Sequence, residues 1–364
     1  MFVYADHENI HFSKGTWLLQ EQQATCYASG ANVVFTTDAL TKGNKTITLH
    51  LNLPNVEAGY EPVIAYNING VYWGYARALS EVVITLPSGV PNCTETPFMS
   101  NLPFHYIEIW VRTTSNQKPR WTNNQVKNNN VMILQSIEVD DASIFYETRL
   151  NNLTMLAVGS SSSEGFGTVG KEFDDITSND ATCSFGALLG ESLGITVSTV
   201  GYGGTGLAKM GDGWAPDALT YYKYMDEGIV RDWTGIDIAV FNVGANDNVN
   251  SADFINLNYE LVDELSGSYP NLTIIMTSPF YGTRLSEYAV MRNKYAANNH
   301  IHFIDANYQN ILSNHHPTIS NYKRYIMPDL RDKVRPLIFS EVSVSIKTVS
   351  NNSNYYTFQS ISHS

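Results

Sequence analysis

The sequence predicts an α/β protein in which an N-terminal β-sandwich of jelly-roll type precedes a parallel sheet between helices. Two observations predict this order: short alternating runs fill residues 10–148 without helical stretches between them, and apolar strands alternate with helices after residue 153. The chain has 364 residues, which is long for one core. We expect a sandwich at 1–150, an α/β domain at 151–340 and a strand extension at 341–364.

The first half carries the alternation of apolar and polar residues that is typical of half-buried strands. Residues 46–53 alternate with a period of two, and similar runs follow at 63–68, 81–86, 105–111 and 133–139. Because no helical pattern separates these strands, they predict a sandwich or jelly roll.

The second half alternates between nearly continuous apolar strands and helices. The pattern predicts strands at 153–158, 195–200, 236–243, 272–277 and 302–305, and helices at 185–191, 259–265 and around 322–330. Such strands belong to a parallel sheet that helices cover on both faces, as in flavodoxin-like domains. Ligands bind beyond the carboxyl ends of these strands, so the following loops are the places to look for functional residues.

Composition excludes several classes of partner. The formal net charge is −13 with 22 Lys and Arg residues, which argues against nucleic acid as a partner. No stretch approaches the ~20 apolar residues of a membrane-spanning helix, so we expect no membrane segment. The cysteines Cys26, Cys93 and Cys183 lie far apart and predict neither a zinc site nor a disulfide framework, leaving at most a single bridge.

Serine and glycine follow the first predicted strand of the α/β half, in the segment 159–165. A serine at a tight turn before a helix has an exposed hydroxyl, and the N–H groups at the helix start can hold an oxyanion. A plain Ser/Gly linker would have the same composition. The segment is not a G-x-S-x-G elbow, because position 163 is Ser.

The later loops add three further groups of polar or glycine residues. Four glycines within 201–206 suit an oxyanion hole or a phosphate cradle, although no Gly-Lys-Ser/Thr follows them as a P-loop requires. Asn246 and Asp247 follow the third strand, where an amide can donate to an oxyanion and where ordinary turns also favour Asn and Asp. His315 and His316 form a pair, but no second cluster has ligand spacing, so we expect no metal.

In this order the four blocks resemble the SGNH, or GDSL-type, hydrolases over residues 153–335. The resemblance implies that Ser161 is the nucleophile and His316 the general base. It also implies an oxyanion hole made of the Ser161 and Gly204 N–H groups and the Asn246 side chain, and it implies no cofactor.

Two departures from the family pattern concern the acidic positions. Ser160 replaces the Asp of Gly-Asp-Ser, and Ser313 replaces the acid three residues before His316. One interpretation is a weakened or inactive enzyme. The other, which we prefer, is a Ser-His dyad in which a backbone carbonyl near Ser313 orients the imidazole.

A β-sandwich before such a domain, with a carbonyl in place of the acid, resembles carbohydrate esterase family 2, whose members remove O-acetyl groups from sugars. Similar domains occur on phage tail proteins. The resemblance implies an acetylated polysaccharide or oligosaccharide as substrate. Separately, aromatic rings can stack on sugars, and Trp214, which follows the glycine-rich loop, is the best candidate for this role unless it is simply packed. A composition rich in Asn, Ser, Thr and Tyr favours an extracellular protein, secreted or on a virion surface, and leaves an oligomer possible. The sequence is also compatible with an esterase for lipid or small esters and with a carbohydrate-binding protein that has a degenerate hydrolase domain.

Overall fold

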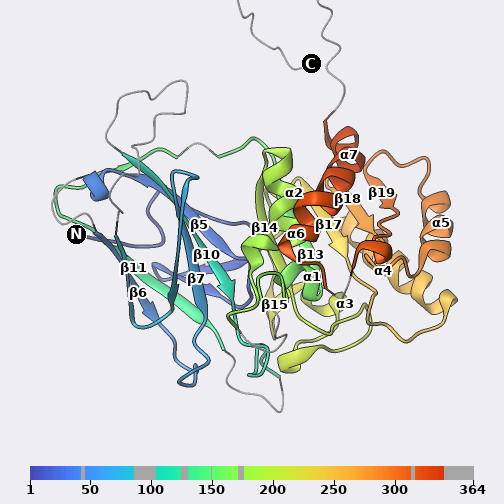
Figure 1. Cartoon of the computed structure of the whole chain (residues 1–364), viewed down its shortest axis with the longest axis horizontal. Helices are drawn as coiled ribbons and strands as arrows, with labels where there is room; N and C mark the ends of the chain where they lie inside the picture. The colour runs from blue at the N-terminus through green and yellow to red at the C-terminus, as the bar shows by residue number, and fades with distance from the viewer. Residues whose placement is uncertain are drawn as a thin grey trace, which may run out of the picture.

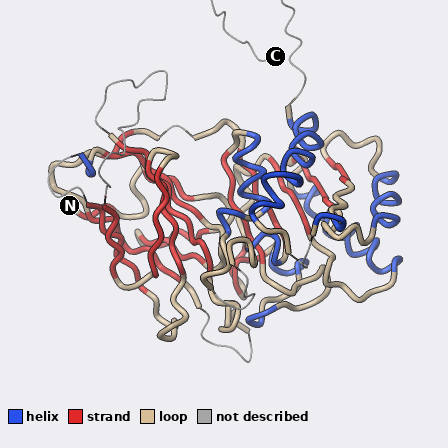
Figure 2. Tube along the Cα trace, in the orientation of Figure 1, coloured by secondary structure: helices blue, strands red, loops and turns tan. Residues whose placement is uncertain are grey.

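The protein, described here by a computed structural model, has an antiparallel N-terminal half and a parallel C-terminal half (Figure 1). The structure describes residues 1–41, 46–85, 104–123, 130–148, 150–170, 176–312 and 316–339. Figure 2 shows that strands fill the N-terminal half, whereas strands and helices alternate in the C-terminal half. The predicted fold class is therefore confirmed. The strands expected within 341–364 lie outside the described residues.

Two antiparallel sheets form the sandwich. The first has the order β3 (Trp17–Gln20), β4 (Gln23–Cys26), β11 (Met132–Glu138), β6 (Thr46–Asn52) and β9 (Glu81–Thr85), with β1 (Phe2–Val3) beside β11. The second has the order β12 (Phe145–Tyr146), β5 (Asn32–Thr37), β10 (His105–Thr113), β7 (Val63–Ile68) and β8 (Tyr72–Arg77), with β2 (Ile10–Phe12) beside β5. Their inner faces enclose one apolar core.

The five strands predicted in this half are all present. The structure also contains strands that the sequence pattern did not predict, and each was missed for a physical reason. Most of them are short. β5 is longer, but it is buried along its whole length and so lacks a period of two. Its Val33 and Phe35 face the sandwich core, while Asn32 faces the α/β half and donates through Nδ2 to the carbonyl of Val197 at 2.7 Å.

The α/β half contains a five-stranded parallel sheet in the order β14 (Thr196–Gly201), β13 (Thr154–Gly159), β17 (Ile238–Asn242), β18 (Thr273–Thr277) and β19 (Ile301–Ile304). In chain order this is 2-1-3-4-5, the flavodoxin-like arrangement that the sequence predicted. The order reverses between β13 and β17, and a crevice opens at such a point beyond the carboxyl ends of the strands.

Helices cover both faces of this sheet. They are α1 (Ser161–Glu164), α2 (Phe185–Leu193), α3 (Ala218–Tyr221), α4 (Ser251–Ser268), α5 (Leu285–Lys294), α6 (Ile319–Asn321) and α7 (Met327–Ile338), with a π-helical turn at Tyr322–Ile326 and a small hairpin of β15 (Tyr224–Asp226) and β16 (Ile229–Val230). Among the described residues, no helix is long and apolar enough to span a bilayer.

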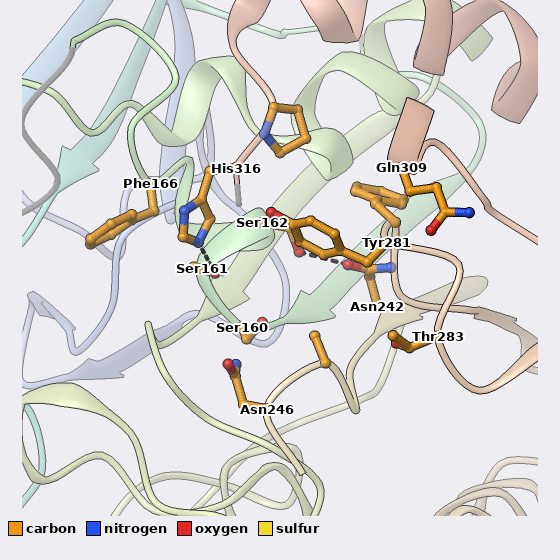
Figure 3. Close-up of a pocket in the computed structure, with 13 residues that line it drawn as sticks. Ser160, Ser161, Ser162, Phe166, Asn242, Asn246, Tyr281, Thr283, Gln309 and His316 are labelled. Atoms are coloured by element: carbon orange, nitrogen blue, oxygen red, sulfur yellow. Dashed lines mark hydrogen bonds between the residues drawn. The ribbon is translucent and has the colours of Figure 1, made fainter. Parts of the chain in front are cut away.

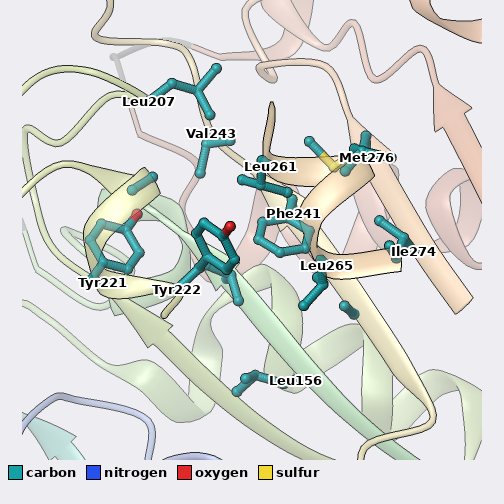
Figure 4. Packing of buried hydrophobic residues seen from close by; sticks show 14 of the residues in the cluster. Leu156, Leu207, Tyr221, Tyr222, Phe241, Val243, Leu261, Leu265, Ile274 and Met276 are labelled. Atoms are coloured by element: carbon teal, nitrogen blue, oxygen red, sulfur yellow. The ribbon is translucent and has the colours of Figure 1, made fainter. Parts of the chain in front are cut away.

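Alternate residues of each strand serve the two faces. Leu156 and Phe241 belong to the apolar cluster that includes Leu261 and Leu265 of α4 (Figure 4), whereas Met155 and Val240 belong to the cluster with α2 and α7. Helix α4 begins eight residues before the predicted start because Asn250 caps it by accepting the N–H of Asp253. Its first turns are polar, which hid them from the apolar pattern, and α5 has too few buried residues to give one.

The sandwich covers the edge strand of the parallel sheet. The N–H of Thr199 in β14 donates to the carbonyl of Gly30 at 3.2 Å, and Asn32 binds the carbonyl of Val197. An added Cβ on Gly30 would lie 1.8 Å from Thr199 Oγ1, so this close approach requires glycine. The edge of the sheet is therefore paired with the sandwich rather than left open.

Candidate active site

A cavity of about 710 Å³ opens at the carboxyl ends of β13 and β17, where the strand order reverses. Its volume is within the range typical of ligand sites. Figure 3 shows how the side chains converge from the loops after four strands; the wall consists of Ser160, Ser161, Ser162, Phe166, Asn242, Ala245, Asn246, Phe280, Tyr281, Thr283, Gln309, His316 and Pro317.

The structure brings Ser161 and His316 together. His316 Nε2 lies 2.8 Å from Ser161 Oγ, a hydrogen-bond distance across which a proton can move. The ring of Phe166 packs 4.9 Å from the imidazole, centroid to centroid, and limits its position. The turn that presents Ser161 requires glycine before it, because a Cβ on Gly159 would lie 2.4 Å from Ser163 Oγ.

The group expected to orient His316, a backbone carbonyl near Ser313, lies outside the described residues. Three aspartates lie near His316 in the sequence and could have oriented it. In the structure each of them forms an ion pair with a lysine or an arginine. Asp305 pairs with Arg292 at 2.6 Å, Asp329 with Lys333 at 2.8 Å and Asp332 with Arg331 at 2.8 Å. Lys333 and Tyr308 also lower the pKa of Asp329 although burial opposes them.

Asn246 and Asp247 join the third loop to the glycine-rich loop. Asn246 lines the cavity and donates through Nδ2 to the carbonyl of Thr205 at 2.9 Å. An amide has two N–H groups, so Asn246 retains one donor for a ligand. The carboxylate of Asp247 accepts the N–H groups of Leu207 and Ala208 at 2.7 and 3.0 Å. Asp247 therefore caps the glycine-rich loop.

Gly204 and Trp214 are not among the residues that line this cavity. Gly204 has φ of +76°, and a Cβ there would lie 3.2 Å from Asp212 Oδ1. Trp214 ends a short turn that begins at Asp212, has φ of +58° and leaves 48% of its surface exposed. Their proposed roles in oxyanion binding and sugar contact remain predictions.

The sequence did not reveal Glu164 and Arg120 as a supporting pair. Their side chains form an ion pair and are only 0% and 1% exposed, respectively. Glu164 Oε2 also accepts the N–H of Gly203 at 2.7 Å. Burial raises the pKa of Glu164, and the Arg120 guanidinium and the Gly203 N–H oppose that rise. The one sequence feature that could have indicated this pair is Glu164 itself, a single carboxylate in a segment that otherwise contains only Ser and Gly.

Two further parts of the wall come from loops without a recognisable motif. Phe280, Tyr281 and Thr283 follow β18, and Gln309 follows β19. Asn242, at the end of β17, accepts the hydroxyl of Ser162 at 2.7 Å and so fixes the start of α1.

In the described part of the chain, no group of three or more His, Cys, Asp or Glu residues could hold a metal ion.

Comparison with known proteins gives matches in structure only. No family model and no curated protein sequence matches the chain. A family two carbohydrate esterase from Clostridium thermocellum, solved with cellohexaose, has a TM-score of 0.67 at 16% identity and covers 90% of this chain and 98% of its own. An acetyl xylan esterase from the rumen bacterium Butyrivibrio proteoclasticus has a TM-score of 0.69 at 14% identity, with coverages of 92% and 98%.

A more distant match broadens the chemistry associated with the fold. A salicylyl-acyltransferase from a tetracycline biosynthetic pathway has a TM-score of 0.57 at 11% identity and covers 93% of this chain and 99% of its own. All three matches include the sandwich as well as the α/β domain, since they cover nine tenths or more of this chain. The protein therefore has the two-part fold of the family two carbohydrate esterase from Clostridium thermocellum.

Proposed function

We propose that this protein is a carbohydrate O-acetylesterase, which hydrolyses acetyl esters on a polysaccharide or oligosaccharide through an acyl-enzyme on Ser161. The observation that carries the proposal is the 2.8 Å separation between Ser161 Oγ and His316 Nε2 at the wall of a cavity. The fold supports the substrate class, since an acetyl xylan esterase and a cellohexaose-binding esterase share it.

The geometry suits a two-step acyl transfer. As Ser161 Oγ forms a bond to the ester carbonyl carbon, His316 Nε2 takes the hydroxyl proton, and the carbonyl π electrons move onto oxygen. The oxyanion is stabilised by N–H donors of Ser161 and Gly204 and by the second N–H of Asn246. Ser161 begins α1, where N–H groups have no acceptor within the helix.

Collapse of this intermediate breaks the bond to the sugar oxygen, which takes the proton from His316. His316 then removes a proton from water, and the resulting hydroxide attacks the acetyl carbon. When the second intermediate collapses, Ser161 regains its proton and acetate leaves. No cofactor is required by these steps.

The same acyl-enzyme supports a rival reaction. If an alcohol other than water accepts the acyl group, the protein is an acyltransferase, like one of the structures that share its fold. The fold is also compatible with hydrolysis of lipid or small esters and with a purely carbohydrate-binding role. Because the chain has a net charge of −13, a polysaccharide substrate would be neutral or cationic. A polysaccharide substrate would also place the protein outside the cell or on a virion surface.

The test is release of acetate from p-nitrophenyl acetate and from acetylated xylan. Wild type should turn over both, and Ser161→Ala and His316→Ala should each lose about 10³-fold or more in kcat. Ser266→Ala and His300→Ala change the same residue types outside the cavity and should retain activity. Turnover that persists in Ser161→Ala would contradict the nucleophile assignment, and acyl transfer to an added alcohol in preference to water would favour the acyltransferase.

A further inference from the structure

The sandwich lies beside the α/β domain along β14 (Figure 1). A second cavity lies between the two halves, lined by residues of β7 and β10 on one side and of β14 and α2 on the other. Its volume is about 280 Å³. From the α/β side it is lined by residues 195–197 at the start of β14, whereas the cavity with Ser161 lies at the carboxyl ends of the sheet. The two cavities therefore lie at opposite ends of the parallel strands.

One row of side chains crosses the sandwich sheet at this place. In the strand register, Trp73 of β8 pairs with Asn67 of β7, Asn67 with Glu108 of β10, and Glu108 with Val34 of β5. Directly paired residues point to the same face of a sheet, and all four line the cavity. The register thus places an indole, an amide and a carboxylate side by side on one wall.

The aromatic wall is accessible. Trp73 is 40% exposed although it is a large apolar side chain on a strand. Tyr106 and Trp110 flank Glu108 on β10 and also line the cavity. An accessible indole face beside polar groups matches the apolar face of a pyranose ring, which such rings bind by stacking.

Two carboxylates supply hydrogen-bond acceptors. Glu108 lies on the sandwich side and Glu191 on α2, across the cavity. Within the part of the chain that the structure describes, neither carboxylate has an ion-pair partner. Burial raises the pKa of Glu108, the charge of Glu191 adds to the rise, and the Trp110 indole opposes it. Glu191 and the ionised form of Glu108 repel phosphates and sulfates, and neither carboxyl group attracts an anion, so a neutral ligand fits better.

We propose that this cavity binds one pyranose ring of a neutral saccharide, with the ring stacked on Trp73 and its hydroxyl groups hydrogen-bonded to Glu108, Glu191 and Asn67. Asn67 already accepts the N–H of Gly70 through Oδ1 at 2.6 Å, so its amide N–H groups are the donors for the ligand. The ligand class rests on the proposed function, because the saccharide is of the same kind as the proposed substrate.

The position of the second cavity decides whether a bound saccharide can react. A saccharide held here has no access to Ser161, so it is not the ester that reacts. It holds a polysaccharide on the protein while another part of the chain, or a neighbouring chain, reaches the first cavity. Such attachment raises the effective concentration of acetyl groups at Ser161.

The experiment measures binding in the full chain carrying Ser161→Ala, which removes turnover. Methyl β-D-glucopyranoside and methyl β-D-xylopyranoside are the probes, and saturation-transfer NMR reports their dissociation constants. Adding Trp73→Ala should weaken binding about tenfold or more, and Glu108→Ala should do the same. Tyr75→Ala is the matched control: Tyr75 lies two residues along β8, is 51% exposed and does not line the cavity.

A second comparison separates this site from the active-site cavity. Asn246→Ala alters the first cavity and should leave binding of the probes within about twofold. Binding that is lost in Asn246→Ala but kept in Trp73→Ala, or no binding of either probe at about 10 mM, would overturn the inference. Acetate release by the wild type tests the proposed function independently, so an active esterase without this site is a distinct result.

Discussion

Arg120 of the loop after β10 forms an ion pair with Glu164, which lies three residues after Ser161, and both side chains are almost completely buried. Arg120 also donates to the carbonyl of Asp212 at 3.1 Å, while Glu164 accepts the N–H of Gly203. A residue of the N-terminal half therefore connects the turn that carries the nucleophile with the glycine-rich loop. Among the described residues, none from the sandwich half lines the cavity, and Arg120 supports the site through its contacts with Glu164 and Asp212.

Arg120→Met should be among the most destabilising single substitutions in the protein. It leaves Glu164 buried without its partner, which costs about 3–5 kcal/mol of unfolding free energy. Urea denaturation measures this loss, and kcat should fall as well because the Gly203 loop loses its anchor. Arg77→Met is the control: its ion pair with Glu61 lies at the surface, with Arg77 48% exposed, and should contribute less than about 1 kcal/mol. Equal losses for the two variants would contradict a special role for Arg120.

Asn246→Ala should lower kcat by about 10²–10³ with a much smaller change in KM, because an oxyanion donor acts in the transition state. The hydrogen bond to Thr205 is lost too, so thermal unfolding must be measured beside kinetics. Asn250→Ala is a useful comparison four residues away. Asn250 caps α4, and its loss should cost about 1 kcal/mol of stability without the fall in kcat. Unchanged kcat in Asn246→Ala would remove this residue from the oxyanion hole.

Gly204→Ala should reduce both stability and activity. The backbone at Gly204 has φ of +76°, and the added Cβ would lie 3.2 Å from Asp212 Oδ1. Gly228→Ala measures the loss of stability that comes from a positive φ alone. Gly228 has φ of +74°, and nothing lies within 4 Å of its Cβ position. We expect about 1 kcal/mol for Gly228→Ala and a larger loss for Gly204→Ala. If Gly204→Ala keeps full activity, its N–H is not held in place for the oxyanion.

Sequence patterns predicted the parts of this protein that depend on local periodicity. The parallel strands have continuous apolar runs because helices cover both faces. In the sandwich, β6, β9, β10 and β11 alternate because one face of each strand is more open. β5 was missed because its outer face packs against the other half, so nothing in its own sequence alternates. That burial depends on an association between domains, which local sequence does not encode.

The same distinction applies to the candidate site. Ser161 and His316 were expected to meet because each follows a strand of one sheet, in an order that resembles a known family, and the structure places them 2.8 Å apart. The contact between Arg120 and Glu164 joins residues 44 positions apart across two domains, and no spacing rule predicts it. The cavity beside Trp73 depends on strand register and domain packing together, so it also required the structure.

Arg284, at the start of α5, and Glu287, in the first turn of that helix, form a second support for the loop that carries Asn246. Arg284 donates to the carbonyls of Asp247 and Val249 at 3.1 and 2.8 Å and to Glu287 at 3.2 Å. Burial opposes ionisation of Glu287, but hydrogen bonds from Ser286, Ser251 and its own backbone, together with Arg284, outweigh it and lower its pKa to about 2. The ionised form of Glu287 is thus the form that the folded protein stabilises.

This depressed pKa predicts how stability depends on pH. An unfolded glutamate has a pKa of roughly 4.3, so the stabilisation by ionised Glu287 is complete above about pH 5 and is lost as pH falls toward 2. Glu287→Gln should lower the unfolding free energy by about 1–2 kcal/mol at pH 7, a figure reduced for solvent screening, and by less at pH 3. Urea midpoints of the two proteins between pH 7 and pH 3 measure the difference. Ser251→Ala removes one donor and should give an intermediate loss at pH 7. A difference between wild type and Glu287→Gln that stays constant with pH would show that Glu287 does not act through its charge.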